Sequence, residues 1–373
     1  MSTRRLLLGD EAVALGAIDA GLSGVYAYPG TPSTEITEFI QNSPLARQRG
    51  IRSRWCTNEK TAMEAALGMS YCGKRALVCM KHVGMNVCAD AFVNSAITGV
   101  NGGLVVLAAD DPSMHSSQNE QDSRFYGKFA MVPIMEPGNQ QECYDAMQWA
   151  FDLSEKLRLP VLMRLVTRLS HSRANVVVGD TAREQNAFHP DHDKHWVLLP
   201  AIARKQYNLL ISLQPKMEEA SEQSPLNRME TVSGKGLGII AAGIGYNYVR
   251  EANPQGVSAI LKIGQYPLPE KEIRRMAADS DAILVVEDGQ PFIEETIRGM
   301  LGAGYPVRGR LTGDLPRTGE LNPDWVRKAL GKDVDITFTD IHEVVGRPPA
   351  LCQGCGHRDV YKALNEIAAE YDG

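Results

Sequence analysis

The sequence has no block of lysine and arginine and no long apolar run without polar interruption. Its 39 basic and 45 acidic residues give a net charge of −6, which makes nucleic acid a poor candidate partner. The longest uncharged stretch of note, 91–109, contains asparagine, serine and a glycine pair. It therefore predicts a helix, a turn and a buried strand rather than a bilayer span, and no membrane partner is expected.

Cysteine is scarce and forms no disulfide framework, because the seven cysteines are scattered at positions 56, 72, 79, 88, 143, 352 and 355. Three leucines at 6–8 are too few for the apolar region of a signal peptide. Together these features predict a reduced, cytoplasmic protein. Hydrophobic residues at 43% and charged residues at 23% exclude disordered and collagen-like chains.

Short β-rich segments alternate with helical ones from the N-terminus onwards. Asp10 is placed to cap a first helix, and Thr34 is placed to cap the helix that follows the strand 25–28. Since the strands are almost continuously apolar, they predict a doubly wound parallel sheet of the α/β class. A second, smaller α/β unit begins near Gly236.

The 373 residues leave room for two domains and a remainder at roughly 150 residues per domain. We expect a first domain over 1–180, a charged connecting arm over 181–232, a second α/β domain over 233–345 and the start of a third over 346–373.

Two further patterns are weak. His189, His192 and His195 alternate with Asp191 and Asp193, but their spacing in a proline-containing loop fixes no metal geometry, and a solvated loop is favoured. The Gly-x-Gly pair at 243 and 245 lacks the third glycine of a dinucleotide-binding motif, so a tight strand-to-helix turn is favoured there.

Polar residues gather where three predicted strands of the first domain end. Tyr28, Pro29, Gly30, Thr31, Pro32 and Ser33 follow the first strand, Lys81, His82, Gly84 and Asn86 the third, and Asp110 to Asp122, including His115, Gln118 and Asn119, the fourth. Ligands gather at the carboxyl ends of parallel strands, which predicts a binding site at this edge. A solvated surface loop is the alternative for the last segment.

Glu59 lies at or near the start of a helix, where a carboxylate is often only a favourable partner of the helix dipole. Its position also follows a strand end that faces the same edge as Thr31 and His82. A carboxyl there could exchange a proton with a ligand nitrogen.

Cys352 and Cys355 form a Cys-x-x-Cys pair, which offers two soft ligands to zinc or an iron–sulfur cluster. A closed site needs two more ligands, and no further cysteine follows. On spacing alone this is half a metal site.

Eight segments together resemble the 2-oxoacid:ferredoxin oxidoreductase family, and within it the large (alpha) subunit of indolepyruvate ferredoxin oxidoreductase. They are YPGTPSTEI (28–36), NEKTAMEAALG (58–68), MKHVGMNVCAD (80–90), DDPSMHSSQNEQDSR (110–124), SPLNRME (224–230), LGIIAAGIGYNYV (237–249), VVEDGQPFIEE (285–295) and LCQGCGHR (351–358).

The resemblance implies a thiamine diphosphate enzyme whose pyrimidine-binding domain is the first domain, with a transketolase-C-terminal-like second domain. Glu59 would be the catalytic residue that hydrogen-bonds the aminopyrimidine ring of the cofactor. The cofactor-binding residues expected beside it are Tyr28, Pro29, Gly30, Thr31, His82 and Asn86.

The same resemblance implies oxidative decarboxylation of a 2-oxo acid in aromatic amino acid catabolism, with coenzyme A as co-substrate, [4Fe-4S] clusters and ferredoxin as electron acceptor. A smaller beta subunit and an oligomeric assembly are expected. Pyruvate-specific relatives carry an arginine at the fourth strand end, where this chain has Ala108, Ala109 and Asp110. An aryl pyruvate is therefore favoured, with the substrate-binding residues Thr31, His82, His115, Gln118 and Asn119.

One family feature is missing: no Gly-Asp-Gly stands in a strand-to-helix context, so the Mg²⁺ and diphosphate anchor is expected in a segment that this chain lacks. The chain thus resembles a C-terminally truncated subunit, and we expect it to bind thiamine diphosphate weakly and to be inactive when isolated. The alternatives are a non-catalytic or split-gene interaction module of the same complex, or a subunit for pyruvate or 2-oxoglutarate.

Overall fold

The computed structural model describes residues 3–231, 235–334 and 356–371. The chain divides into two units, 1–334 and 335–373, and each is described by itself. In the second unit the structure describes one helix, α14 (Gly356–Ala368), on which Val360, Tyr361, Leu364 and Ile367 are exposed. Cys352 and Cys355, expected as metal ligands, lie outside the described residues.

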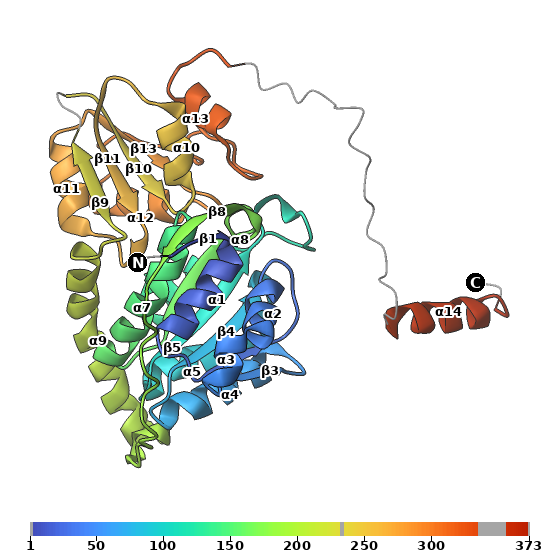
Figure 1. Cartoon of the computed structure of the whole chain (residues 1–373). Helices are drawn as coiled ribbons and strands as arrows, with labels where there is room; N and C mark the ends of the chain where they lie inside the picture. Colours follow the sequence, from blue (N-terminus) through green and yellow to red (C-terminus); the bar gives the residue numbers. More distant parts are fainter. Residues whose placement is uncertain (1–2, 232–234, 335–355, 372–373) are drawn as a thin grey trace. The chain divides into compact units, whose positions relative to one another are not determined.

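The larger sheet of the first unit has the strand order β12-β6-β7-β5-β4-β2-β3. Figure 1 labels β5, β4 and β3 of this sheet. Its strands are β2 (Gly24–Ala27), β3 (Arg52–Trp55), β4 (Ala76–Lys81), β5 (Leu104–Asp110), β6 (Ile134–Met135), β7 (Val161–Val166) and β12 (Gln265–Tyr266). All neighbouring strands from β6 to β3 run parallel. Every residue of β5 and β7 is buried, as expected where helices cover both faces.

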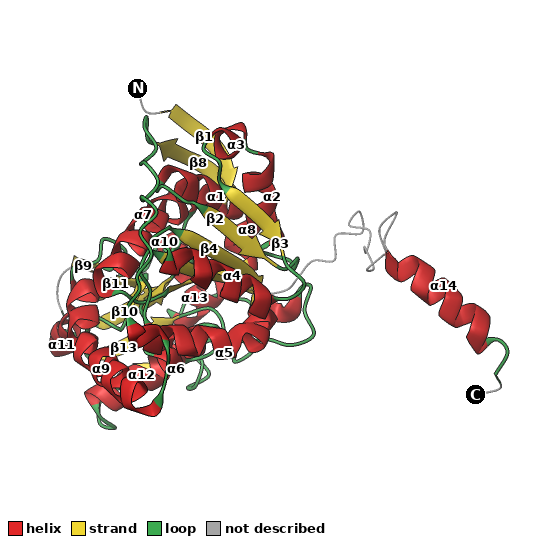
Figure 2. Cartoon of the chain, turned by 90° about the horizontal axis from the view of Figure 1, so that it is seen from below, coloured by secondary structure: helices red, strands yellow, loops and turns green. Residues whose placement is uncertain are grey.

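Two groups of helices pack on this sheet (Figure 2). The first group is α1 (Gly9–Asp19), α2 (Thr34–Asn42), α3 (Pro44–Gln48), α7 (Gln140–Leu157) and α8 (Thr167–His171), in which α1 packs against α2 and α7. The second is α4 (Glu59–Tyr71), α5 (His82–Thr98), α6 (Arg124–Ala130) and α9 (Pro200–Glu222), in which α5 packs against the other three. Asparagines cap two of them, since Asn58 accepts from Thr61 N and Asn139 from Glu142 N, both at 2.9 Å.

The smaller sheet has the order β14-β13-β10-β11-β9. Its strands are β9 (Arg228–Thr231), β10 (Leu237–Ala242), β11 (Val257–Ile263), β13 (Ala282–Val286) and β14 (Val307–Arg308), and its helices are α10 (Gly245–Ala252), α11 (Glu270–Ala278), α12 (Phe292–Leu301) and α13 (Pro323–Ala329). Only β9 runs antiparallel to its neighbour in this described sheet. Gly243 has φ +48°, a conformation suited to glycine, at the strand-to-helix turn. The α/β class predicted from the alternating pattern is confirmed.

The two α/β segments are joined through an edge strand. β12 follows β11 in the chain but pairs antiparallel with β6 of the larger sheet. Asn227 holds this crossing, because its Oδ1 accepts from Gly264 N at 2.8 Å and Gln265 N at 2.9 Å. The helix α9, which lies in the segment expected to be a connecting arm, adds a hydrogen bond from Ser221 Oγ to the Gln265 carbonyl at 3.1 Å.

A third, two-stranded sheet pairs β1 (Thr3–Leu8) antiparallel with β8 (Arg173–Val178), which the alternation of the sequence does not reveal. No helix in the described ranges is long and apolar enough to cross a membrane.

The two predicted helix caps are wrong. The N-cap of α1 is Leu8, whose N–H donates to Glu11 at 2.8 Å, so Asp10 lies inside the first turn and is buried. Thr34 is likewise the first residue of α2 rather than its cap, and its hydroxyl accepts from Gly30 N at 3.0 Å. The residue types were correct for a first turn, but the helices start two residues (α1) and one residue (α2) earlier than predicted, which decides which side chain can reach the free N–H groups.

Candidate functional site

The strand ends expected to carry the site do meet at one edge of the larger sheet. Ala27 of β2 pairs with Cys79 of β4 and with Trp55 of β3, and Lys81 at the end of β4 pairs with Ala109 of β5. The loops that leave these strands therefore start side by side, as the rule for parallel sheets requires.

The loop 28–33 is a closed turn with exposed tips. Ser33 donates to the Gly30 carbonyl through its N–H and its hydroxyl, both at 2.9 Å, while Tyr28 and Thr31 are exposed. A Cβ on Gly30 would lie 3.1 Å from Cβ of Lys81, so the loop packs tightly against the end of β4. Thr31 is thus exposed on a turn that these contacts hold in place.

Glu59 is the first residue of α4 and is only 8% exposed. Its Cγ and Oε1 occupy the space above Gly84, where a Cβ would lie 2.7 Å from both atoms. None of the described groups donates a hydrogen bond to its carboxylate at hydrogen-bonding distance. The structure therefore places a nearly buried carboxyl with open lone pairs at this edge, seated on a helical turn that only glycine accommodates.

His82 begins α5 and is 1% exposed. Its Nε2 lies 3.1 Å from the Asn119 carbonyl oxygen, which can only accept, so Nε2 carries the proton in the neutral ring. Nδ1 is then an acceptor, and it is buried without a partner among the described residues. A buried acceptor of this kind is suited to a donor group of a ligand.

Two further residues lie beside these: Tyr126, which the sequence analysis missed, and Lys81, which it placed at this edge without a role. Tyr126 of α6 donates its hydroxyl proton to Asn86 Oδ1, and Lys81 donates from Nζ to the Ser116 carbonyl. Burial lowers the pKa of Lys81, with Asp111 opposing the shift. The polar character of Lys81 after an apolar strand was visible in the sequence, whereas nothing in the local pattern around Tyr126 pointed to Asn86.

The loop 110–122 is organised by Asp111. Its carboxylate accepts from Ser116 N at 2.8 Å, Ser117 Oγ at 2.5 Å and Thr167 Oγ1 at 2.7 Å. Burial alone would raise the pKa of Asp111, but these hydrogen bonds outweigh it and the pKa lies below its usual range. Gln118 and Asn119 have exposed side chains on this loop.

His115 is paired with Glu320 rather than with a residue of the Glu59 edge. Its Nε2 lies 3.3 Å from Glu320 Oε2, and Glu320 also accepts two hydrogen bonds from Arg168, at 2.7 and 2.6 Å. The structure thus brings Thr31, Glu59, His82 and Asn86 to one sheet edge and holds His115 in an ion-pair cluster with the second α/β segment.

Beside this edge lies a buried ion network, in which five carboxyl groups surround three guanidinium groups. Its members are Asp110, Asp122, Glu136, Glu287 and Asp288 with Arg124, Arg164 and Arg310. Arg164 bonds Asp110 and Glu136, each at 2.5 Å, and Arg124 bonds Asp122 at 2.5 Å and Glu287 at 2.8 Å. The network therefore ties the end of β5 to the end of β13.

The carboxyl groups of the network differ widely in pKa. Burial raises the pKa of Glu287 to about 7, with Arg124 opposing, and that of Asp288 to about 6, with Arg310 opposing. For Asp122 the burial effect is outweighed by Arg124 and Arg164, which hold its pKa to about 2. Burial thus makes Glu287 and Asp288 the carboxyls of the network that take up protons at about pH 7 and about pH 6.

The histidine and aspartate loop of the sequence forms a smaller group, in which Asp191, Asp193 and His195 have their ligand atoms within 4.8 Å of one another. Asp191 is already paired with Arg158 at 2.6 Å. His189 is not part of this group.

Comparisons with known proteins show what the chain is similar to. The sequence profile described as pyruvate flavodoxin/ferredoxin oxidoreductase, thiamine diphosphate-binding, matches residues 15–224. The indolepyruvate oxidoreductase subunits IorA of Methanothermobacter thermautotrophicus and Thermococcus kodakarensis are both 39% identical, over 378 and 392 residues. Each alignment covers 98% of this chain and 61% or 60% of the relative, so the chain spans about three fifths of their length.

A 2-oxoglutarate synthase subunit KorA of Methanothermobacter thermautotrophicus is 27% identical over 348 residues, covering 79% of this chain and 90% of that subunit. Among solved structures, a 2-oxoglutarate:ferredoxin oxidoreductase from Magnetococcus marinus superposes with a TM-score of 0.70 at 16% identity, over 88% of this chain and 65% of that one. A split-gene transketolase gives a TM-score of 0.52 at 14% identity, over 87% and 95% of the two chains. These two likenesses concern the fold.

Proposed function

The chain belongs to the pyruvate flavodoxin/ferredoxin oxidoreductase family through its thiamine diphosphate-binding region, and from this premise we propose that it supplies the pyrimidine side of a cofactor site in an indolepyruvate oxidoreductase. The proposed overall reaction converts indolepyruvate and coenzyme A to indoleacetyl-CoA, carbon dioxide and one proton, with two electrons passing to ferredoxin.

The observation that carries the proposal is the position of the Glu59 side chain, packed against Gly84. A nearly buried carboxyl with no described hydrogen-bond donor sits on Gly84, at the edge where the Thr31 loop and His82 also lie. This arrangement fits an aminopyrimidine, because a ring nitrogen and an amino group need one carboxyl and one further acceptor at hydrogen-bonding distance. His82 Nδ1 is a buried acceptor without a partner in the described structure.

In this proposal the bound thiamine diphosphate supplies the electron sink that decarboxylation of a 2-oxo acid requires. Glu59 holds or gives a proton at the pyrimidine nitrogen, and the low polarity around it strengthens that hydrogen bond. Thr31 presents its hydroxyl to the substrate side, and Tyr28, Pro29, Gly30 and Asn86 shape the rim of the site.

The proposed preference for an aryl pyruvate rests on how the arginines of this edge are used. Arg164 is enclosed in the ion network, and Arg168 is held by Glu320. Neither guanidinium is available to grip a small carboxylate in the described structure. In their place we propose His82, His115, Gln118 and Asn119 as the donors and acceptors on the substrate side.

Further parts of the proposal concern the complete enzyme. We place the Mg²⁺ and diphosphate anchor and the [4Fe-4S] clusters outside the described residues, with Cys352 and Cys355 as cluster or zinc ligands. A smaller beta subunit, ferredoxin, an oligomeric assembly and a cytoplasmic location complete it. The proposed domains are 1–180, the arm 181–232, 233–345 and the start of a further domain over 346–373.

Substrate competition in the complete oxidoreductase tests this function. Reduction of a low-potential electron acceptor should be fastest with indolepyruvate and at least ten-fold slower, in kcat/KM, with pyruvate and 2-oxoglutarate. Omission of thiamine diphosphate should abolish all three activities. Equal or faster turnover of pyruvate or 2-oxoglutarate would refute the indolepyruvate assignment, and activity without the cofactor would refute the thiamine diphosphate site.

A further inference from the structure

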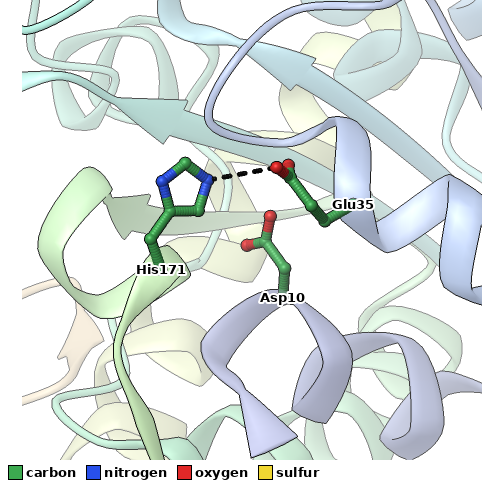
Figure 3. A group of neighbouring side chains, drawn as sticks. All are labelled: Asp10, Glu35 and His171. Atoms are coloured by element: carbon green, nitrogen blue, oxygen red, sulfur yellow. Dashed lines mark ion pairs between the residues drawn. The ribbon is translucent and has the colours of Figure 1, made fainter. Parts of the chain in front are cut away.

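Three ionisable side chains from distant parts of the chain meet within the helical group that contains α1, α2 and α8 (Figure 3). Asp10 lies in the first turn of α1, Glu35 in the first turn of α2, and His171 at the end of α8. Their ligand atoms all lie within 4.8 Å of one another. Asp10 is 0% exposed, and the proposed thiamine diphosphate site uses none of the three residues.

Three of the four carboxylate oxygens of this group lack a hydrogen-bond donor among the described residues. Both oxygens of Asp10 and Oε2 of Glu35 are buried and accept no hydrogen bond from the described residues. The hydroxyl of Ser170 is also buried without one. Four of the fifteen such buried atoms in the described part of the chain thus belong to three neighbouring residues. This concentration indicates a binding site for a group that is not part of the described chain.

The helix dipole alone does not account for Asp10. A first-turn carboxylate that serves the helix usually accepts a free backbone N–H, as Glu11 does from Leu8 at 2.8 Å. Asp10 accepts none in the described structure and points instead toward Glu35 and His171 (Figure 3). Burying a carboxyl without a compensating partner is unfavourable, so a bound group would relieve a real cost.

The geometry is close to that of a metal centre. His171 Nε2 already lies 3.5 Å from Glu35 Oε1. Ligand atoms bound tetrahedrally to zinc at about 2.1 Å are roughly 3.4 Å apart, so small side-chain rotations would bring Asp10 to the same centre. Two carboxylate oxygens and one imidazole nitrogen match the ligand types of zinc, with Ser170 or water left for a fourth position.

We propose that Asp10, Glu35 and His171 bind one divalent cation of the zinc class. The ion would cross-link α1, α2 and α8, and it would fix the start of α2 directly after the exposed loop that carries Thr31. The competing occupant is water beside a protonated Asp10. Burial raises the pKa of Asp10 well above its usual range.

Calorimetric titration of the full chain with zinc chloride tests the proposal. His171→Ala should weaken binding at one site by at least about 100-fold, because an imidazole ligand is lost. His192→Ala removes an exposed histidine outside the group and should leave that site unchanged. All cysteines remain in both variants, so zinc bound by cysteine is the same in the three proteins. Equal titrations for the wild type and His171→Ala would overturn the proposal.

Thermal unfolding of Asp10→Asn separates a cation from water. Without metal, the variant should unfold at the same temperature as the wild type or above it, because a buried carboxyl without a partner is removed. Zinc should raise the unfolding temperature of the wild type and not of the variant. An equal rise in both would overturn the proposal. If Asp10→Asn does not fold, Glu35→Gln, at a half-buried position, is read by the same criterion.

Discussion

The buried ion network and the Glu59 edge lie beside each other on one sheet but use their polar groups in opposite ways. In the network nearly every charged atom has a partner: Arg164 alone joins Asp110, Glu136 and the Asp288 carbonyl. Only one oxygen each of Asp110 and Asp288 is left over. At the edge, the Glu59 carboxylate and His82 Nδ1 are both left without a donor by the described residues.

The difference separates two roles for buried polar groups. A network in which nearly every charged atom has a partner joins the two α/β segments, so its residues should contribute mainly to stability. An edge that keeps lone pairs open should contribute little to stability and much to binding and catalysis. Substitutions in the network should therefore change the free energy of unfolding most, and substitutions at the Glu59 edge least.

Arg164→Ala should have the largest effect. It leaves Asp110 and Glu136 buried without their guanidinium partner, which should lower the free energy of unfolding by about 3–5 kcal/mol in urea denaturation. The matched control is Arg168→Ala, four residues along, whose half-exposed pair with Glu320 should contribute at most about 1 kcal/mol. Similar losses in the two variants would contradict the structural role of the network.

The pH dependence of stability should show the excess carboxyls of the network. The pKa of Glu287 is about 7 in the folded protein against 4.5 as its ordinary value, so the folded state binds the proton more tightly. This stabilisation is complete below about pH 4.5 and is lost as the pH rises through about 7. Glu287→Gln should reduce the fall in unfolding free energy between pH 5 and 8 by on the order of 1–3 kcal/mol.

Glu295→Gln, at an exposed position of α12, is the control for this titration. It should leave the pH profile of the unfolding free energy as in the wild type. A profile that is identical in wild type and Glu287→Gln would show that Glu287 does not carry the proton.

Gly84→Ala should have a smaller effect on stability. The new Cβ would lie 2.7 Å from Glu59 Cγ and Oε1 and push the carboxyl off its seat. The clash costs about 1–3 kcal/mol, and the better helix propensity of alanine offsets up to about 1 kcal/mol of it. Gly68→Ala in α4 meets nothing within 4 Å and should instead gain about 0.5–1 kcal/mol. Equal gains in the free energy of unfolding for both variants would contradict the close packing of Glu59 against Gly84.

Glu59→Gln should have the smallest effect on folding. Since no described group donates to this carboxylate, replacing it should change the free energy of unfolding by less than about 0.5 kcal/mol in the same denaturation experiment. A loss of about 2 kcal/mol or more would place Glu59 among the structural groups.

Much of the larger sheet could be predicted because its strands are buried on both faces and read as apolar runs, as in β4 and β5. The positions of Glu59 at a helix start and of Thr31 and His82 at strand ends follow from the same reasoning. The pair β1 and β8 could not be predicted, because β1 begins Thr-Arg-Arg and four of its residues are exposed. Pairing partners 170 or so residues apart leave no local trace.

The ion network and the Asp10 group could not be predicted from the sequence for a related reason. Arg164 lies inside an apolar strand and Asp10 in a first turn, where a charged residue is ordinarily exposed or capping. Only the packing of β7 and β13 against α6, and of α1 against α2 and α8, shows which charges meet. Helix α9 was likewise hidden, because its few buried residues, such as Leu210 and Met217, are widely spaced among charged ones.

Activity of Glu59→Gln in the complete oxidoreductase tests the central claim most directly. With saturating thiamine diphosphate, kcat for indolepyruvate should fall by about 100- to 10,000-fold, because the carboxyl that moves a proton at the cofactor is lost. Glu64→Gln, on the exposed side of the same helix, should keep the wild-type rate. Wild-type turnover in Glu59→Gln would contradict the assignment of this sheet edge as the pyrimidine side of the site.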